Sequence, residues 1–144
     1  MSAGWNRYKP RSKYGNDAVK TLDQRFDSQL EEAYNQRLAM YERTGDIQEF
    51  EYHPDPVILL PVPKIAWRID FRVIGRDGLI FYVETKGMDD PTYILKRKIY
   101  ENLAEEKNLP PLLIIKGKRQ RNGDWTFRPD RAIGMEEIDF LDIR

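Results

Sequence analysis

The sequence contains no cysteine and a single histidine, and both facts limit the chemistry available to it. Without cysteine there is no disulfide, no thiolate zinc site and no cysteine nucleophile. One histidine, His53, cannot supply the histidine cluster of a metalloprotease-like site. A metal site in this chain must therefore be built from carboxylates, which favours a hard ion such as Mg²⁺ or Mn²⁺. His53 lies among prolines, and we expect it to be structural.

Long apolar runs are also absent. No stretch approaches the ~20 residues needed to cross a bilayer, and the first residues lack the apolar segment of a secretory signal. We therefore expect no membrane partner and a cytoplasmic location. The 144 residues suit one domain with one core.

The charged residues balance, with 24 basic and 24 acidic side chains, but they are unevenly distributed. Residues 1–25 carry six Lys and Arg against two Asp, with three aromatic residues between them. A second basic cluster spans residues 116–121. Basic segments with aromatics suit phosphate contacts and base stacking, although a solvated tail and a solvated turn would give the same pattern. The DNA contacts predicted from these clusters are Lys9, Arg11, Lys13, Lys118, Arg119 and Arg121.

The pattern of apolar residues predicts the element order α-β-β-β-α-β-β. Residues 1–25 have no periodicity and are expected to form a basic flexible arm, followed by one domain over residues 26–144. Ser28 and Glu31 form a capping-box pattern that predicts a helix start, and Gly45 predicts its end. The predicted elements are a helix over 28–44, an extended segment 47–62, strands 65–74 and 79–86, a helix over 92–107, a buried strand 112–115, a strand 124–128 and a short helix over 135–142.

The segment Gly75-Arg76-Asp77-Gly78 predicts a hairpin with a three-residue loop that ends in a left-handed glycine. The residue numbers of every cross-strand pair then sum to 154, so Asp70 lies opposite Glu84. A two- or four-residue loop would send the two carboxylates to opposite faces. The register assigns to one face, as core, Ile69, Phe71, Val73, Phe81 and Val83. It assigns to the other face Arg68, Asp70, Arg72, Tyr82, Glu84 and Lys86.

Two carboxylates that face each other across neighbouring strands repel. Side-chain pairing therefore does not explain Asp70 opposite Glu84, whereas a divalent cation between them would turn the repulsion into binding energy. The alternative is a pair of solvated surface carboxylates relieved by Lys86.

An Asp on one strand, followed by Glu-x-Lys on the next and preceded by a helix with a Glu, resembles the PD-(D/E)XK nuclease superfamily. Here the motif reads Asp70, thirteen intervening residues, then Glu84-Thr85-Lys86-Gly87. Over residues 13–103 the chain is similar to a phage-encoded family of small endonucleases regarded as candidate Holliday-junction resolvases or recombination nucleases. The segments that carry this similarity are Lys13-Tyr14-Gly15-Asn16, Phe26-Asp27-Ser28 with Glu31, Gly45-Asp46-Ile47, Asp70-Phe71, Val83-Glu84-Thr85-Lys86-Gly87, Tyr93 and Lys96. Two departures are Ile69 in place of proline before Asp70, and residues 117–144 beyond the shared core.

The resemblance implies an α/β fold with a restriction-endonuclease-like core, α-β-β-β-α-β, in which helices flank a mixed central sheet. It implies Mg²⁺ or Mn²⁺ held by Asp70, Glu84 and the backbone carbonyl of Thr85, with Glu31 completing the shell or holding a second ion. Lys86 would position a water or deprotonate it, and we favour positioning. The aligned glutamate is Glu31 rather than Glu32, because Glu31 borders the apolar stripe of its helix. The alternative role of Glu31 is to cap the helix with Ser28.

The activity implied is metal-dependent hydrolysis of DNA phosphodiester bonds, acting on branched DNA in the manner of a Holliday-junction resolvase. Two sites at a fixed spacing would then require a homodimer. If the protein is phage-encoded, its compartment is the host cytoplasm. Lys96 and Lys98 on the second helix are further candidates for backbone contacts, or else part of a solvated face. The alternatives are a sequence-specific or replication and recombination endonuclease of the same fold, and a DNA-binding module that does not cut.

Overall fold

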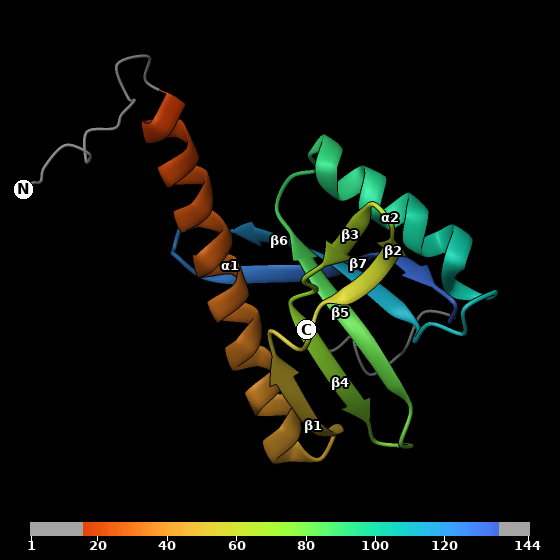
Figure 1. Ribbon diagram of the computed structural model, residues 1–144. Coiled ribbons are helices and arrows are strands. Elements are labelled where there is room, and N and C mark those ends of the chain that lie inside the picture. The colour runs from red at the N-terminus through yellow and green to blue at the C-terminus, as the bar shows by residue number, and fades with distance from the viewer. Residues whose placement is uncertain (1–15, 136–144) are drawn as a thin grey trace, which may run out of the picture.

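The computed structural model describes residues 16–135, and for residues 16–26 it describes the backbone alone. Two helices flank a mixed sheet (Figure 1). The elements are α1 (Asn16–Thr44), β1 (Ile47–Tyr52), β2 (Val57–Pro61), β3 (Lys64–Trp67), β4 (Phe71–Gly75), β5 (Ile80–Lys86), α2 (Pro91–Ala104), β6 (Leu112–Arg119) and β7 (Trp125–Ile133).

The main sheet has five strands in the order β1-β4-β5-β6-β7. The β5–β6 pair is parallel, with α2 as the crossover, and the other neighbouring strands are antiparallel. A separate hairpin, β2–β3, interrupts the path from β1 to β4. Without this hairpin the order is α1-β1-β4-β5-α2-β6-β7, which matches the predicted α-β-β-β-α-β-β.

Each face of the main sheet has its own apolar core. Strand β6 serves both, because its successive side chains point to opposite faces. Leu113 and Ile115 pack with α1, and Leu112 and Ile114 pack with α2 and the β2–β3 hairpin. All four are at most 1% exposed, which confirms the predicted buried central strand. The domain therefore has two cores rather than the single core expected from its length.

We expected one face of the β4–β5 hairpin to carry only functional side chains, but α2 and the β2–β3 hairpin cover that face too. Phe71, Val73, Phe81 and Val83 pack on the α1 side as predicted. Ile69 was assigned to the same side, but it belongs to the core under α2. The reason is that Ile69 precedes β4, so strand alternation does not reach it.

Helix α1 begins earlier than predicted. It starts at Asn16, so Ser28 lies inside the helix and is not its N-cap, and residues 16–25 of the expected arm are helical. Its buried stripe is Leu30, Tyr34, Leu38 and Tyr41, as helical spacing requires. Residues 1–15, with Lys9, Arg11 and Lys13, lie outside the described residues.

The end of α1 follows the prediction. Gly45 has φ +84°, a left-handed conformation that costs glycine little. Its N–H donates to the carbonyl of Glu42 (3.2 Å), and the N–H of Asp46 donates to that of Tyr41 (2.8 Å). This pair of bonds is the Schellman motif that terminates many helices.

Other boundaries differ from the sequence-based prediction. The expected strand 65–74 is two strands in different sheets, β3 and β4. The second helix ends at Ala104 rather than 107. Strand β6 runs to Arg119 and β7 to Ile133, so this hairpin is longer and its turn tighter than predicted. A break in register opposite Ile114–Ile115 marks a bulge in β7. The predicted helix 135–142 lies almost entirely outside the described residues.

Among residues 16–135, neither helix is both long and apolar enough to span a membrane.

Candidate active site

The β4–β5 hairpin has the predicted register. The observed pairs run from Phe71 with Val83 to Ile74 with Ile80, and the two residue numbers sum to 154 in each. The N–H of Gly75 donates to the carbonyl of Leu79 at 2.8 Å, which closes the three-residue loop. The last loop residue, Gly78, has φ +89°, as the bulge turn requires. At the other end of the hairpin this register brings Asp70 beside Glu84.

The two carboxylates are held by backbone and side-chain donors. Oδ2 of Asp70 accepts hydrogen bonds from the N–H of Thr85 (2.9 Å) and from its hydroxyl (2.7 Å). Oε1 of Glu84 accepts from the N–H of Asp70 at 3.1 Å. Asp70 is therefore turned towards Thr85, because it precedes β4 and does not follow the strand alternation that we had assumed. The expected ligand role of the Thr85 carbonyl stays a prediction.

Both carboxyl groups are buried, with 7% of Asp70 and 5% of Glu84 exposed. Burial raises the pKa of Asp70 to about 6, and the charge of Glu31 adds to the rise, while the hydrogen bonds from Thr85 and the charge of Lys86 oppose it. Burial also raises the pKa of Glu84 well above its ordinary value, with a further contribution from Asp70. The site is thus short of positive charge at neutral pH and favours the uptake of a proton or a cation.

Helix α1 brings Glu31 to this position. Leu30 and Tyr34 are buried under the helix, and Glu31 lies at the border of their stripe, while Glu32 is exposed. The hydroxyl of Tyr52 donates to Oε1 of Glu31 at 2.7 Å. The prediction of Glu31 over Glu32, made from their positions around the helix, is therefore consistent with the structure, in which Glu31 lies near Asp70. The capping alternative fails, because Ser28 is inside α1.

His53 is the site residue that the sequence reasoning missed. Its Nε2 lies 3.2 Å from Oε1 of Glu31, and its ring stacks on Tyr52 with 3.7 Å between centroids. The backbone N–H of His53 donates to the backbone carbonyl of Asp70 at 2.7 Å, and the backbone of His53 has φ +55°. One ligand atom each from Glu31, His53 and Asp70 lie within 4.8 Å of one another, an arrangement able to hold a metal ion.

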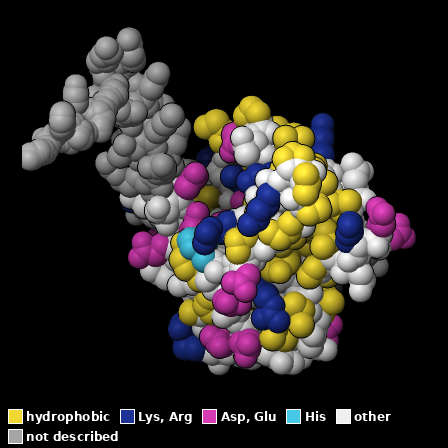
Figure 2. Space-filling model, viewed as in Figure 1, with side chains coloured by type: hydrophobic (Ala, Val, Ile, Leu, Met, Phe, Trp, Pro, Cys, Tyr) yellow, Lys and Arg dark blue, Asp and Glu magenta, His cyan; other side chains and the backbone are white. Residues whose placement is uncertain are grey.

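A signal for His53 did exist in the pairing of β1 with β4. Tyr52 pairs with Phe71, so the next residue along β1 meets Asp70. Because the β2–β3 hairpin separates β1 from β4 along the chain, this register could not be predicted from the sequence. Figure 2 shows the chain's one histidine at the surface beside acidic and basic side chains.

Lys86 lies close to the carboxylates and is 19% exposed. Its Nζ is 3.8 Å from Oε2 of Glu84, 3.6 Å from Oδ2 of Asp90 and 5.0 Å from the centroid of the Tyr93 ring. Asp90 is the N-cap of α2 and accepts a hydrogen bond from the N–H of Tyr93 at 2.9 Å. That bond lowers the pKa of Asp90, and the charge of Lys86 lowers it further. The start of α2 thus fixes the ammonium group beside Glu84.

The candidate DNA contacts do not form one cluster. Lys118 lies on the α2 face of β6, whereas Arg119 lies on the α1 face and donates to Gln29 at 3.2 Å. Arg121 is exposed in the β6–β7 turn. Lys96 and Lys98 are on α2, half-buried and exposed respectively. The structure therefore separates residues that the sequence had grouped.

Comparison with known proteins gives a family without an assigned activity. No curated protein matches the chain significantly. No solved structure does so either. Residues 11–120, which are 110 of the 144, match the family described as "Protein of unknown function (DUF1064)". This match covers α1, the hairpin and all four candidate catalytic residues, and the chain belongs to that family.

Proposed function

We propose that this protein is a metal-dependent DNA endonuclease with a restriction-endonuclease-like core of the PD-(D/E)XK type. The observation that carries the proposal is the pair of buried carboxyl groups, Asp70 and Glu84, at the end of the hairpin away from its turn, with Glu31 and Lys86 beside them. Ionisable groups with shifted pKa values that converge from separate elements are typical of active sites. The mixed sheet with a helix on each face supports the fold assignment.

The residues at the site fit a divalent cation. The ligand atoms that lie within 4.8 Å of one another belong to Glu31, His53 and Asp70. With Glu84 and the carbonyl of Thr85 next to them, they would offer the oxygen ligands that Mg²⁺ and Mn²⁺ prefer. The pKa of Asp70 is raised mainly by burial and further by the charge of Glu31, and a bound cation would oppose both effects. The imidazole of His53 adds a nitrogen donor, which suits Mn²⁺ better than Mg²⁺. When bound, such an ion supplies Lewis-acid polarisation of the phosphodiester and lowers the pKa of a bound water.

The chain's own groups perform the remaining work. Thr85 fixes the orientation of the Asp70 carboxylate through two hydrogen bonds. Glu84, Asp90 and the Tyr93 ring hold the Lys86 ammonium in a position from which it can orient a water molecule or a phosphate oxygen. A positioned ammonium also stabilises the charge that develops on the phosphate.

Branched DNA is the substrate class that we propose, by analogy with the resolvases that the sequence resembles. A four-way junction presents two equivalent strands, so paired cleavage requires a homodimer with two sites at a fixed spacing. A sequence-specific or replication and recombination endonuclease uses the same site. A non-cutting DNA-binding module is the alternative from a different class, although it would not need the buried carboxylates.

The test is incubation of the full chain with plasmid, linear duplex and four-way junction, each with Mg²⁺, Mn²⁺, Ca²⁺ or EDTA. We expect cutting with Mg²⁺ or Mn²⁺, and binding with little cutting in Ca²⁺, which tolerates looser geometry. Glu84→Gln should abolish cutting, and Asp77→Asn, in the exposed hairpin turn, is the matched control. Full activity in EDTA contradicts the proposal, and DNA binding without cutting in any metal supports the binding module.

A further inference from the structure

A row of cationic side chains crosses three strands of the sheet, starting at Lys86. Lys86 on β5 pairs with Lys116 on β6, and Lys116 pairs with Arg128 on β7. Residues paired across strands project from the same face, here the face covered by α2. Like charges directly opposite one another destabilise a sheet, so the row needs anions nearby.

The protein supplies some of these anions, though not enough for every cation. Lys116 pairs with Asp89, and Arg128 lies 3.5 Å from Asp130 while 70% of its side chain stays exposed. Lys118, one step further along β6 on the same face, is exposed. Within residues 27–135, no carboxylate forms an ion pair with Lys118. Positive charge therefore remains exposed at Lys118 and Arg128, the part of the row away from Lys86.

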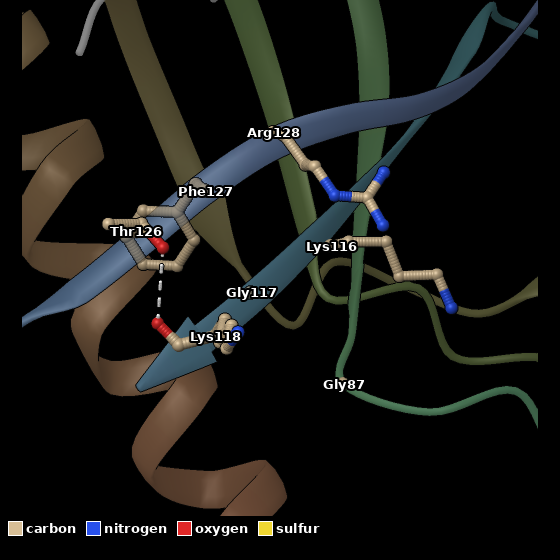
Figure 3. Close-up of a pocket in the computed structure, with 7 residues that line it drawn as sticks. All are labelled: Gly87, Lys116, Gly117, Lys118, Thr126, Phe127 and Arg128. Atoms are coloured by element: carbon tan, nitrogen blue, oxygen red, sulfur yellow. Dashed lines mark hydrogen bonds between the residues drawn. The ribbon is translucent and has the colours of Figure 1, made fainter. Parts of the chain in front are cut away.

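A cavity of about 520 Å³ lies at this row. Its lining includes Gly87, the residue after Lys86, together with Lys116, Lys118, Thr126 and Arg128 (Figure 3). Figure 3 shows the side chains of Lys116 and Arg128 extending in the same direction from neighbouring strands. The lining has three cations and a hydroxyl group and contains no carboxylate. Its chemistry is thus opposite to that of the adjacent site of Glu31, Asp70 and Glu84.

We propose that this cavity binds a backbone phosphate of the DNA strand that enters the active site. The proposal rests on the proposed function, since it assigns the path of that substrate. Two strand spacings of about 4.8 Å separate Lys86 from Arg128, so the Arg128 end of the cavity lies roughly 10 Å from the catalytic lysine. With a rise of about 3.4 Å per nucleotide, that distance corresponds to roughly three nucleotides of duplex.

The same cationic lining would also attract a free phosphate or a mononucleotide. The unbroken row of cations favours DNA over a small phosphate ligand, because it begins at Lys86 and leads into the cavity across neighbouring strands. A polyanion neutralises several cations of the row at once, whereas a free phosphate neutralises only those within the cavity. The experiment therefore needs both kinds of ligand.

The test is DNA binding by the double variant Lys118→Ala/Arg128→Ala in the full chain. Binding of a labelled duplex is followed by fluorescence anisotropy in Ca²⁺ over a range of salt concentrations. Loss of two cations that neutralise backbone phosphate should make the slope of log affinity against log salt shallower by up to about 2 units. The double variant Lys64→Ala/Lys107→Ala removes the same charge from exposed positions away from the cavity and should leave the slope unchanged.

An unchanged slope in Lys118→Ala/Arg128→Ala overturns the proposal. Calorimetry with inorganic phosphate and with a mononucleotide supplies the second arm: tight binding by the wild type that the double variant loses overturns it as well. Urea unfolding checks that the variants fold, and Lys118→Gln/Arg128→Gln replaces the alanine pair if they do not. A wild type that binds duplex in Ca²⁺ with this salt dependence but does not cut in Mg²⁺ or Mn²⁺ defeats the nuclease proposal and leaves the phosphate site standing.

Discussion

Replacing Asp70 with asparagine should stabilise the metal-free protein at neutral pH. The carboxamide oxygen of asparagine can still accept both hydrogen bonds from Thr85. The substitution removes a buried negative charge that Glu31 and Glu84 repel. A variant that loses catalysis would thus gain stability, which is the usual relation between strained active sites and folding.

The pKa of Asp70 sets the sign and size of the effect. It rises from 3.8 to about 6 on folding, and each pKa unit corresponds to about 1.4 kcal/mol. A raised pKa means that the contribution of the group to stability is fully present below its unfolded value and is lost as the pH rises through 6. Above that pH the ionised group costs the folded state about 3 kcal/mol. For a chain of 144 residues this equals about 10 °C in Tm.

The assay is urea unfolding in EDTA from about pH 4.5 to about pH 7.5, with wild type and Asp70→Asn side by side. Their difference in unfolding free energy should grow as the pH rises to about 6, and titrating groups away from Asp70 cancel in the comparison. Asp55→Asn, at an exposed carboxyl group between β1 and β2, should show no such growth. A gap that stays constant across this range refutes the reasoning. Added Mn²⁺ should stabilise the wild type more than the variant.

Three further predictions concern single residues. Glu31→Gln should slow DNA cleavage by a large factor and Glu32→Gln should not, as a gel assay would measure; the reverse result would mean that the wrong glutamate was chosen. His53→Asn, which tolerates φ +55°, should weaken Mn²⁺ binding by about tenfold and Mg²⁺ binding less, measured by calorimetry, and equal losses would exclude a ligand role. Gly45→Ala should cost about 1 kcal/mol in urea unfolding, because φ is +84° there; no loss would mean that the helix end relaxes.

Local chemistry made part of this structure predictable. The turn glycine Gly78 fixed the loop length, and the loop length fixed the register that joins Asp70 to Glu84. Gly45 likewise marked the end of α1 through its backbone conformation. In both cases one residue type, at one position, leaves few alternatives for the chain.

The parts that failed depend on contacts between distant segments. The start of α1 is a separate case: Ser28 has the sequence of an N-cap, yet α1 continues through it and begins at Asn16. The alternation of β4, extended back to Ile69, predicts that this side chain packs on the α1 side. Ile69 precedes β4, however, and packs under α2. His53 reaches Glu31 only because β1 pairs with β4 across an inserted hairpin. Propensity and periodicity carry no information about such pairings.

The bulged strand β7 has a consequence for how copies of this protein can associate. It forms one edge of the main sheet, and an edge strand is a template for a strand of another chain. Pro129 removes one donor from that edge, the bulge breaks its regularity, and Arg128, Asp130 and Arg131 are exposed along it. Edge-to-edge sheet extension at β7 is therefore disfavoured, which protects the fold from aggregation. A homodimer built to cut two strands of a junction must then join its subunits through helices, loops or another edge.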